Sequence, residues 1–229
     1  MGTGSARPLF SPALFRFLRE LEANNDRSWF AANKTRYEDE VRSPALDFVS
    51  EFAPRLERIS ACFVADPRPS GGSLFRIHRD TRFSKDKSPY KTYTGIQFRH
   101  EWGKDAHAPG FYLHLQPKQV FMGAGIWHPD ATTLARIRDA IVEDGEAWLT
   151  ARGAGEHLRL AGDSLKRAPS GYDQEHPLID DLKRKDFICV ATLSERDVCA
   201  PGFVDEFGQL CEQASPLVRF LCSALDAPF

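Results

Sequence analysis

A short segment of mixed basic and aromatic residues carries the clearest potential chemistry in this 229-residue chain. Residues 75–92, FRIHRDTRFSKDKSPYKT, contain six Arg or Lys residues and two Asp residues, in a protein whose formal net charge is -2. This local excess of positive charge predicts an anionic partner, because guanidinium groups suit bidentate binding of carboxylate or phosphate and ammonium groups act as point charges. We refer to residues 75–92 as the basic segment.

Apolar residues between the charges predict that the basic segment is anchored to the rest of the protein. Phe75, Ile77, Phe83 and Tyr90 are interspersed with the cations, and Pro89 restricts the backbone directly before Tyr90. Long basic side chains can pack their aliphatic stems on such residues while their charged ends point elsewhere. The segment therefore has the composition of a fixed binding site for an anion.

Two interpretations of the charges remain open. In the first, the cations converge on a small phosphorylated or carboxylated molecule, and an aromatic residue stacks on its apolar or ring portion. The proposed ligand-binding residues are Arg76, Arg79, Arg82, Lys85, Lys91, Arg99, Trp127 and Arg138. In the second, arginines and aspartates of the segment form an internal salt-bridge network and the lysines lie in water. That network would consist of Arg79, Asp80, Arg82 and Asp86.

Proton transfer at such a site would fall to Tyr112, His114 or His78. Tyr112 and His114 are two residues apart in a predicted strand, so their side chains share one face of the sheet. Neighbouring cations are expected to lower the pKa of His78 and to favour its neutral imidazole. A hydrogen-bonded structural role is the alternative for each histidine. The sequence identifies no reaction, and whether the protein is an enzyme stays open.

Binding of single-stranded nucleic acid or of an acidic protein segment is the alternative class of function. Bases can stack on exposed aromatic side chains such as Tyr90, Tyr93 and Trp127 while their phosphates meet Lys or Arg. The sequence pI near 6.4 argues against a general nucleic-acid binder. A steep fall of binding with added salt would favour this class over a small ligand in a closed pocket.

The other motifs point to a cytoplasmic protein without a metal or another cofactor. His107, His114 and His128 are potential metal ligands, but their spacing matches no known ligand motif, and no GxSxG motif is present. The chain has no apolar run long enough to cross a membrane and no signal-peptide pattern. Five cysteines without a CxxC pair are typical of free thiols in a reducing compartment. The sequence predicts no membrane partner and leaves the oligomeric state open.

Length and composition predict one domain, residues 1–229, in which residues 1–8 form a loose tail. Capping residues, prolines and helical spacing predict helices at about 12–25, 27–42 and 43–62. Pro54 should kink or split the third helix, because proline lacks the amide that would bond back one turn. Residues 66–72, DPRPSGG, then form a loop.

After this loop the apolar residues alternate with period two, which predicts strands. The strands are expected at 93–100, 111–116 and 120–127, with a fourth, almost wholly apolar and therefore buried strand at 187–193. Short connections make the first three an antiparallel meander. One face would be apolar and covered by helices, and the other would carry polar and aromatic side chains. The predicted fold class is α+β, one domain with a mostly antiparallel sheet and helices packed on one face.

Gly123 and Gly125 lie on the polar and aromatic face and predict a groove between Phe121 and Trp127. A ligand or another backbone can approach a sheet closely at glycines. The alternative is a neighbouring helix packed against them.

The C-terminal part is predicted to be mainly helical. Asp130 can cap one helix, and a short helix is expected at 176–184. A last helix at 203–225 should consist of two pieces, because Ser215-Pro216 repeats a helix start signal.

Four stretches together resemble one protein family, domain of unknown function 2461. They are NNDRSWFAANKTRYEDEV (24–41), GGSLFRIHRDTRFSKDKSPYKT (71–92), GAGIWHPDATTLARIRDAI (123–141) and GDSLKRAPSGYDQEHPLIDDL (162–182). The resemblance extends over nearly the whole chain from about residue 9. It implies one cytoplasmic domain and supplies no catalytic residues, so the residues named above rest on their chemistry.

Overall fold

The computed structural model describes residues 7–103, 108–153 and 155–229. Two predicted caps start the N-terminal helices. The Ser11 hydroxyl accepts a hydrogen bond from the amide of Ala13, and the Asp26 carboxylate accepts hydrogen bonds from the amides of Ser28 and Trp29. Both caps satisfy amides that have no partner within the helix. The helices are α1 (Pro12–Ala23), α2 (Arg27–Ala32), α3 (Lys34–Tyr37), the π-helical turn η1 (Glu38–Arg42) and α4 (Ser43–Ile59).

Three helix boundaries differ from the prediction. The predicted helix at 27–42 is broken at Asn33 (φ -109°, ψ 14°), which separates α2 from α3. The backbone stays helical through Ser43 (φ -60°, ψ -48°), so Ser43-Pro44 does not begin a separate helix. Pro54 lies inside α4 and does not split it. Phe52 and Leu56 are buried on either side of Pro54, and their packing holds α4 in one piece despite the missing amide.

Within the described residues, six strands form one sheet in the order β1-β2-β3-β4-β6-β5, and every neighbouring pair is antiparallel. The predicted strands are confirmed as β2 (Thr94–His100), β3 (Gly110–Gln116), β4 (Gln119–Ile126) and β6 (Phe187–Leu193). Sequence patterns missed the strands β1 (Phe63–Val64) and β5 (Arg159–Ala161), because two or three residues are too few to show an alternation of apolar and polar side chains.

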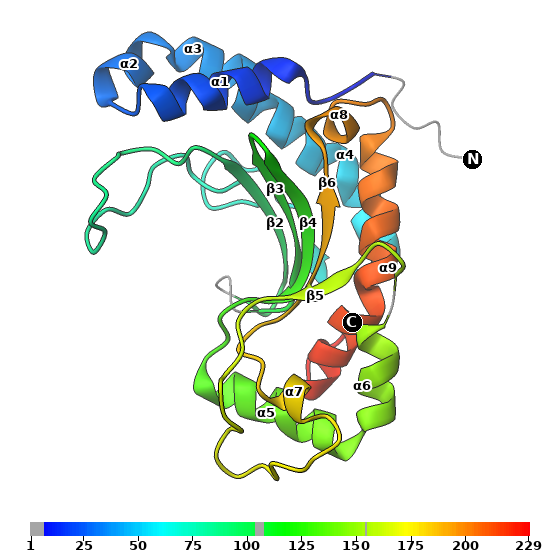
Figure 1. Cartoon of the computed structure of the whole chain (residues 1–229). Coiled ribbons are helices and arrows are strands. Elements are labelled where there is room, and N and C mark those ends of the chain that lie inside the picture. Colours follow the sequence, from blue (N-terminus) through cyan, green and yellow to red (C-terminus); the bar gives the residue numbers. More distant parts are fainter. Residues whose placement is uncertain (1–6, 104–107, 154) are drawn as a thin grey trace.

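Helices cover one face of this sheet, as predicted (Figure 1). Here α4 and α9 (Phe203–Ala224) pack on the apolar side chains of the strands. The Phe98 ring of β2 lies 4.8 Å from the Phe52 ring of α4 and 5.9 Å from the Phe207 ring of α9, measured between centroids. The fold class is therefore confirmed as a single α+β domain.

The remaining helices are α5 (Ala131–Glu143), α6 (Gly145–Arg152), α7 (Ile179–Leu182) and α8 (Glu195–Val198). Asp130 caps α5 as predicted, by accepting a hydrogen bond of 2.7 Å from the amide of Thr133. The prediction of two C-terminal pieces was wrong, because α9 runs unbroken through Pro216. Leu217 and Val218 are buried in the core and keep this part of α9 helical.

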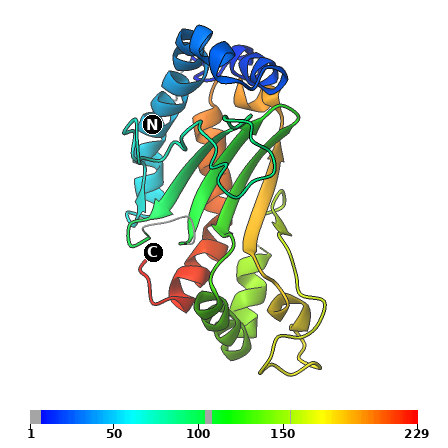
Figure 2. The ribbon, with the colours of Figure 1, turned by 90° about the vertical axis from the view of Figure 1, so that its left-hand side faces the viewer.

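The opposite face of the sheet carries the polar and aromatic side chains, and we call it the open face (Figure 2). Strand β6 contributes to it, since Ile188 and Val190 are partly exposed and Thr192 is exposed. The prediction of a fully buried strand was therefore wrong for one side of β6. In the described part of the chain, no helix combines the length and the apolar character needed to cross a membrane.

Candidate functional site

The basic segment folds back on itself as a hairpin-like loop. The amide of Arg79 donates to the carbonyl of Pro89 (2.9 Å), and the amide of Lys91 donates to the carbonyl of Ile77 (2.8 Å). A hydrogen bond of 2.9 Å from the amide of Phe75 to the carbonyl of residue 95 ties its base to β2. Figures 1 and 2 show the loop projecting from one end of the sheet, on the open face and beneath α1 and α2.

Tyr90 anchors the loop to the N-terminal helices. Its ring is buried and stacks on the Phe30 ring of α2, with centroids 4.1 Å apart. The Asn25 amide donates to the carbonyl of Tyr90 (3.0 Å) and accepts from its amide (3.1 Å). Ile77 is buried as well, so the predicted anchoring is confirmed for these residues. Phe83 is the exception, because it is 96% exposed.

Two internal ion pairs occupy guanidinium groups of the loop. Asp86 binds Arg79 and also accepts hydrogen bonds from the amide and hydroxyl of Ser88, at 2.9 and 2.5 Å. Asp80 binds Arg82 at 2.7 Å. The pKa of Asp86 is held well below its usual range, by Ser88 first and Arg79 second, and that of Asp80 by Arg82. The salt-bridge interpretation is thus confirmed for these four residues, and the expected convergence of free guanidiniums was wrong for Arg79 and Arg82.

An open cleft of about 500 Å³ lies between the loop and the C-terminal end of α1. Its lining includes Asn25, Arg79, Lys91 and Tyr93. The cleft is formed because Asn25 and Tyr90 hold the loop at the end of α1. The lining combines one arginine, one lysine and two tyrosines with the carboxylates of Glu22, Asp80 and Asp86.

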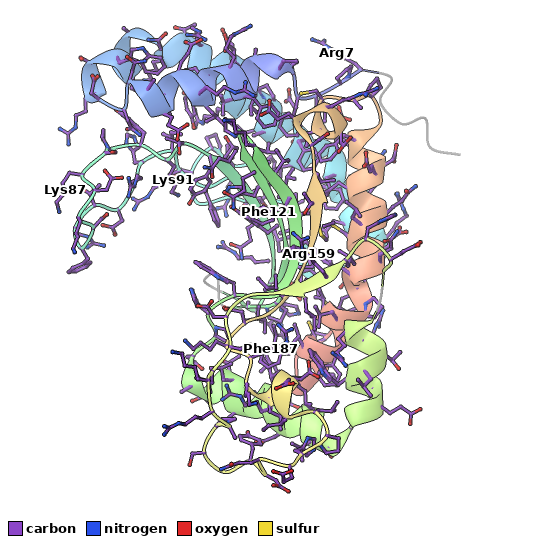
Figure 3. All side chains as sticks on the ribbon, in the orientation of Figure 1. Arg7, Lys87, Lys91, Phe121, Arg159 and Phe187 are labelled. Carbon is purple, nitrogen blue, oxygen red and sulfur yellow. The ribbon has the colours of Figure 1, made fainter. Side chains whose placement is uncertain are left out.

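Lys91 is the distinctive cation of this cleft. Its side chain is partly buried, and Nζ lies 5.2 Å from the ring centroid of Phe75 and 5.7 Å from that of Tyr93. Among the residues that the structure describes, no carboxylate lies within ion-pair distance of Nζ. Burial, and secondarily the charge of Arg76, lowers the pKa of Lys91 from its usual 10.5. Figure 3 shows Lys91 where the loop passes beneath the N-terminal helices.

Tyr112 and His114 form a hydrogen-bonded pair beneath Tyr93. The Tyr112 hydroxyl lies 2.9 Å from Nδ1 of His114. The imidazole is sandwiched between the rings of Tyr93 and Phe121, each with its centroid 4.7 Å away. Figure 3 labels Phe121 on this part of the sheet. The pair does not line the cleft, because His114 is only 8% exposed and Tyr93 lies between.

The environment of these groups shifts their titration. Burial lowers the pKa of His114, with a hydrogen bond to Gln116 acting in the opposite direction, and burial raises the pKa of Tyr112. Burial also raises the pKa of Tyr93. At neutral pH the two phenols therefore keep their protons. Sequence patterns assigned Tyr93 only a stacking role, although its place at the start of the first predicted strand, directly after the basic segment, was a usable signal.

The other cations of the loop are spread around it. His78 lines a second, wider hollow of about 730 Å³ between the loop and the start of α2. Arg76 and Lys85 are exposed, and neither forms a side-chain hydrogen bond with a described residue. Lys87 donates a hydrogen bond of 2.8 Å to the carbonyl of Thr81, and Figure 3 shows it on the projecting part of the loop.

Three predicted ligand-binding residues lie elsewhere. Arg99 is on the open face, at the end of β2 remote from Thr94. Trp127 follows β4, is 56% exposed and has its ring centroid 4.1 Å from that of His128. Arg138 lies on α5, is buried and does not line the cleft. Its guanidinium donates to the carbonyls of residues 182 and 184, at 2.7 and 2.9 Å.

The two groove glycines have different roles. Gly125 has φ +120°, and a Cβ there would lie 2.1 Å from the carbonyl oxygen of Phe187, so the close backbone is that of β6. At Gly123 a Cβ would meet other atoms only at 3.8 Å or more. The helices pack on the other face, so the alternative of a helix against the glycines was wrong.

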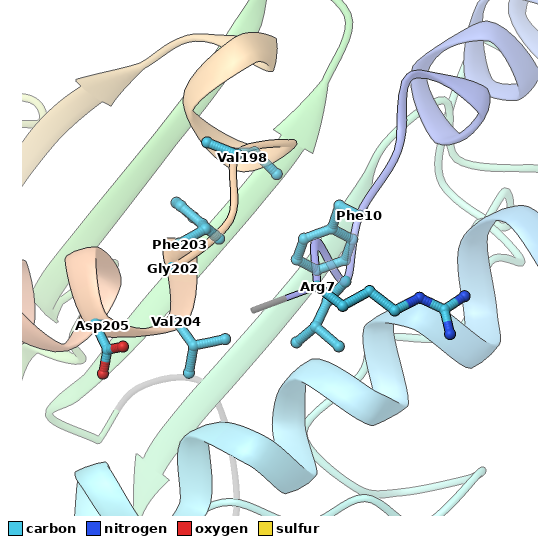
Figure 4. A pocket seen from close by; sticks show the side chains of 9 residues that line it. Arg7, Phe10, Val198, Gly202, Phe203, Val204 and Asp205 are labelled. Atoms are coloured by element: carbon cyan, nitrogen blue, oxygen red, sulfur yellow. The ribbon is translucent and has the colours of Figure 1, made fainter. Parts of the chain in front are cut away.

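Other sites offer less for ligand binding. Of the three histidines considered for a metal, His107 lies outside the described residues. Among the residues that are described, no three His, Cys, Asp or Glu side chains are grouped to hold a metal ion. Figure 4 shows a pocket between Arg7, Phe10 and the start of α9. Its volume of about 10 Å³ admits one water molecule at most.

The fold and this site define a single-domain α+β protein with an open cleft, lined by both basic and acidic side chains, at one end of an antiparallel sheet. A family model described as "Conserved hypothetical protein (DUF2461)" matches residues 13–220, so the chain belongs to this family, as the sequence motifs indicated. No curated protein and no solved structure matches the chain.

Proposed function

We propose that this is a cytoplasmic protein that binds a small molecule with a carboxylate or phosphate group in the cleft beside Lys91. The observation that carries the proposal is the environment of the Lys91 ammonium group, which is partly buried and has no carboxylate partner among the described residues. Removing a charge from water is unfavourable unless an opposite charge compensates it. A ligand anion would supply that compensation.

Two neighbours support the same site. Arg79 lines the cleft beside Lys91, and Asp86 fixes its guanidinium in place. A fixed guanidinium can bind an anion with little further loss of side-chain entropy. Tyr93 adds a phenol that can donate a hydrogen bond to the anion, because it keeps its proton at neutral pH. All five cysteines are free thiols, which supports a reducing compartment.

Isothermal titration calorimetry with inorganic phosphate and with small carboxylates tests the proposal. Lys91→Ala should weaken binding at least ~10-fold, the loss expected for a charged hydrogen-bonding partner. Lys85→Ala is the matched control, because Lys85 is exposed on the same loop and does not line the cleft, and it should bind as the wild type does. Equal affinities in all three proteins would rule out the cleft as the anion site.

Binding of single-stranded nucleic acid is the second candidate, and the exposed Phe83 favours it. The ring of Phe83 is 96% exposed, with the Arg82 guanidinium 5.9 Å from its centroid. A base could stack on this ring while the guanidinium meets a phosphate. Fluorescence anisotropy with short oligonucleotides should then show binding that falls steeply with salt and is lost in Phe83→Ala. Binding that changes neither with added salt nor in Phe83→Ala would exclude this candidate.

A further inference from the structure

Lys91 differs from the other lysines of the basic segment in what surrounds its amine. Lys85 and Lys87 are exposed, whereas Lys91 is partly buried between aromatic rings and lines the cleft. Three carboxylates line the cleft: Asp80 and Asp86 are bound within the loop, and Glu22 of α1 is not within ion-pair distance of the Lys91 amine. The Lys91 amine therefore lies in a hollow large enough for a small molecule without an internal ion-pair partner among the described residues.

This environment makes the neutral, nucleophilic form of the amine more accessible than in an exposed lysine, whereas the ammonium form is the one that binds the anion. A lysine becomes reactive when it is desolvated or placed beside another cation, and both conditions hold here. Burial acts on Lys91 first, and the positive charge of Arg76 adds to it. A carboxylate partner would have the opposite effect, because it would stabilise the ammonium form.

We propose that Lys91 forms an imine with the carbonyl group of a small molecule that also carries an anionic group. This inference rests on the proposed function, because the cleft must hold the anion while the carbonyl carbon reaches the amine. Arg79 lines the same cleft and is suited to hold a carboxylate or a phosphate group. The substrate class is thus an aldehyde or ketone with a nearby carboxylate or phosphate.

The reaction needs no oxidant or reductant. The neutral Lys91 nitrogen attacks the carbonyl carbon, a C–N bond forms, the C–O π bond breaks, and one proton moves from nitrogen to oxygen to give a carbinolamine. Tyr93 then donates its phenolic proton to the departing hydroxyl group, which leaves as water while the C=N bond forms. The nitrogen of the resulting iminium returns a proton to the Tyr93 phenolate. The sum is amine plus carbonyl giving imine plus water.

Reductive trapping tests this chemistry on the full chain. The protein is incubated with pyridoxal 5′-phosphate, or with pyridoxal as the carbonyl probe without an anion, and is then treated with borohydride, which reduces an imine to a stable secondary amine. Intact mass and peptide mapping locate the adduct. Residue 91 should be labelled at least ~10-fold faster than Lys85 or Lys87, and pyridoxal should label it more slowly. Labelling with glyoxylate and borohydride then shows whether a carbonyl probe with a carboxylate is held as well as one with a phosphate.

Matched variants separate this inference from the proposed function. Lys91→Arg keeps a positive charge but cannot form an imine, so it should retain phosphate binding by calorimetry and lose the fast-labelled site. Lys85→Arg should label as the wild type does. Even labelling of all lysines, or unchanged labelling in Lys91→Arg, overturns the inference while phosphate binding can persist. Absence of phosphate binding in the wild type overturns the proposed function instead, and with it the claim that the cleft holds the anionic group.

Discussion

The Tyr112 hydroxyl donates a hydrogen bond of 2.9 Å to Nδ1 of His114. The direction follows from Gln116, because its Oε1 can only accept, which leaves Nδ1 of the neutral imidazole as the acceptor for the phenol. Nε2 of His114 then carries the imidazole proton and donates to Oε1 of Gln116, at 3.1 Å. His114 is thereby held as one neutral tautomer, directly beneath the Tyr93 ring that lines the cleft.

The imidazole of His114 should titrate below its usual pKa of 6.5 in the folded protein, because burial disfavours its charged form. In the pH window between the lowered folded value and the unfolded value, the unfolded chain binds more protons. The free energy of unfolding should therefore fall as pH decreases below about 6.5. Urea unfolding between pH 7.5 and 5 should show a smaller fall in His114→Gln than in the wild type. A parallel dependence in both proteins would contradict the lowered pKa.

Tyr112→Phe should lower the free energy of unfolding by about 1–2 kcal/mol, because it removes the donor to a buried nitrogen. Gly95 leaves room for this hydroxyl, since a Cβ at position 95 would lie 2.6 Å from the Tyr112 oxygen. NMR of the His114 ring nitrogens should show that the single tautomer is lost. A tautomer unchanged in Tyr112→Phe would show that Gln116 alone fixes it.

Period-two patterns were sufficient to predict the sheet because packing follows directly from alternation. Ile96 and Phe98 alternate with Gln97, and the structure buries the first two against helices and leaves Gln97 on the open face. The same local reasoning failed at Ser215-Pro216. A helix start signal states a preference of the backbone, whereas burial of residues on both sides of the proline decides whether the helix ends.

Composition located the basic segment but did not show that Lys91 would be the partly buried cation without a carboxylate partner among the described residues. Which aspartate meets which arginine depends on how the loop folds back, and that fold depends on Asn25, which is 65 residues from Tyr90 in the chain. Lys91 and Lys85 are equivalent by residue type. Only the placement of the loop against α1 makes one of them partly buried and the other exposed.

Asp86→Asn should strengthen anion binding in the cleft by roughly 3- to 10-fold, because neutralising a carboxylate that competes for the Arg79 guanidinium should outweigh the loss of its positioning effect. Asparagine keeps an acceptor for the amide of Ser88, so the loop turn should persist. Calorimetry with phosphate measures the change. Asp80→Asn is the comparison, because Asp80 also lines the cleft but its partner Arg82 does not, so it removes a negative charge without freeing a cation of the cleft and should give a smaller gain. Weaker binding in Asp86→Asn would mean that the ion pair positions Arg79 for the ligand.

Gly123→Ala and Gly125→Ala should differ strongly in stability although the two glycines share the open face. The alanine Cβ at 123 meets only ordinary contacts, so the free energy of unfolding should change by less than about 1 kcal/mol. At 125 the Cβ would collide with the carbonyl of Phe187 at a positive φ, and a loss of about 3 kcal/mol or more is expected. Urea denaturation of both variants measures the difference. Equal values would show that β6 can move away from β4 at this point.

Lys91→Met should raise the melting temperature of the free protein, because it replaces a partly buried ammonium group with an apolar side chain of similar length. The folded pKa of Lys91 is lowered, so the cost of the charge is present at neutral pH and decreases as pH rises toward 10.5. The difference in melting temperature between Lys91→Met and the wild type should therefore become smaller between pH 7 and pH 10.

Phosphate should make the wild type melt at a higher temperature than Lys91→Met, the reverse of the order without phosphate. At a phosphate concentration ~100 times the dissociation constant, binding stabilises the wild type by about 2.7 kcal/mol, whereas Lys91→Met, which has lost the cation, gains little. Thermal unfolding with and without phosphate at pH 7 measures both effects in one experiment, and Lys85→Met should follow the wild type throughout. A variant that is less stable than the wild type without phosphate would show that the Lys91 ammonium group stabilises the fold by itself, and the unmet charge on which the proposed anion site depends would not exist.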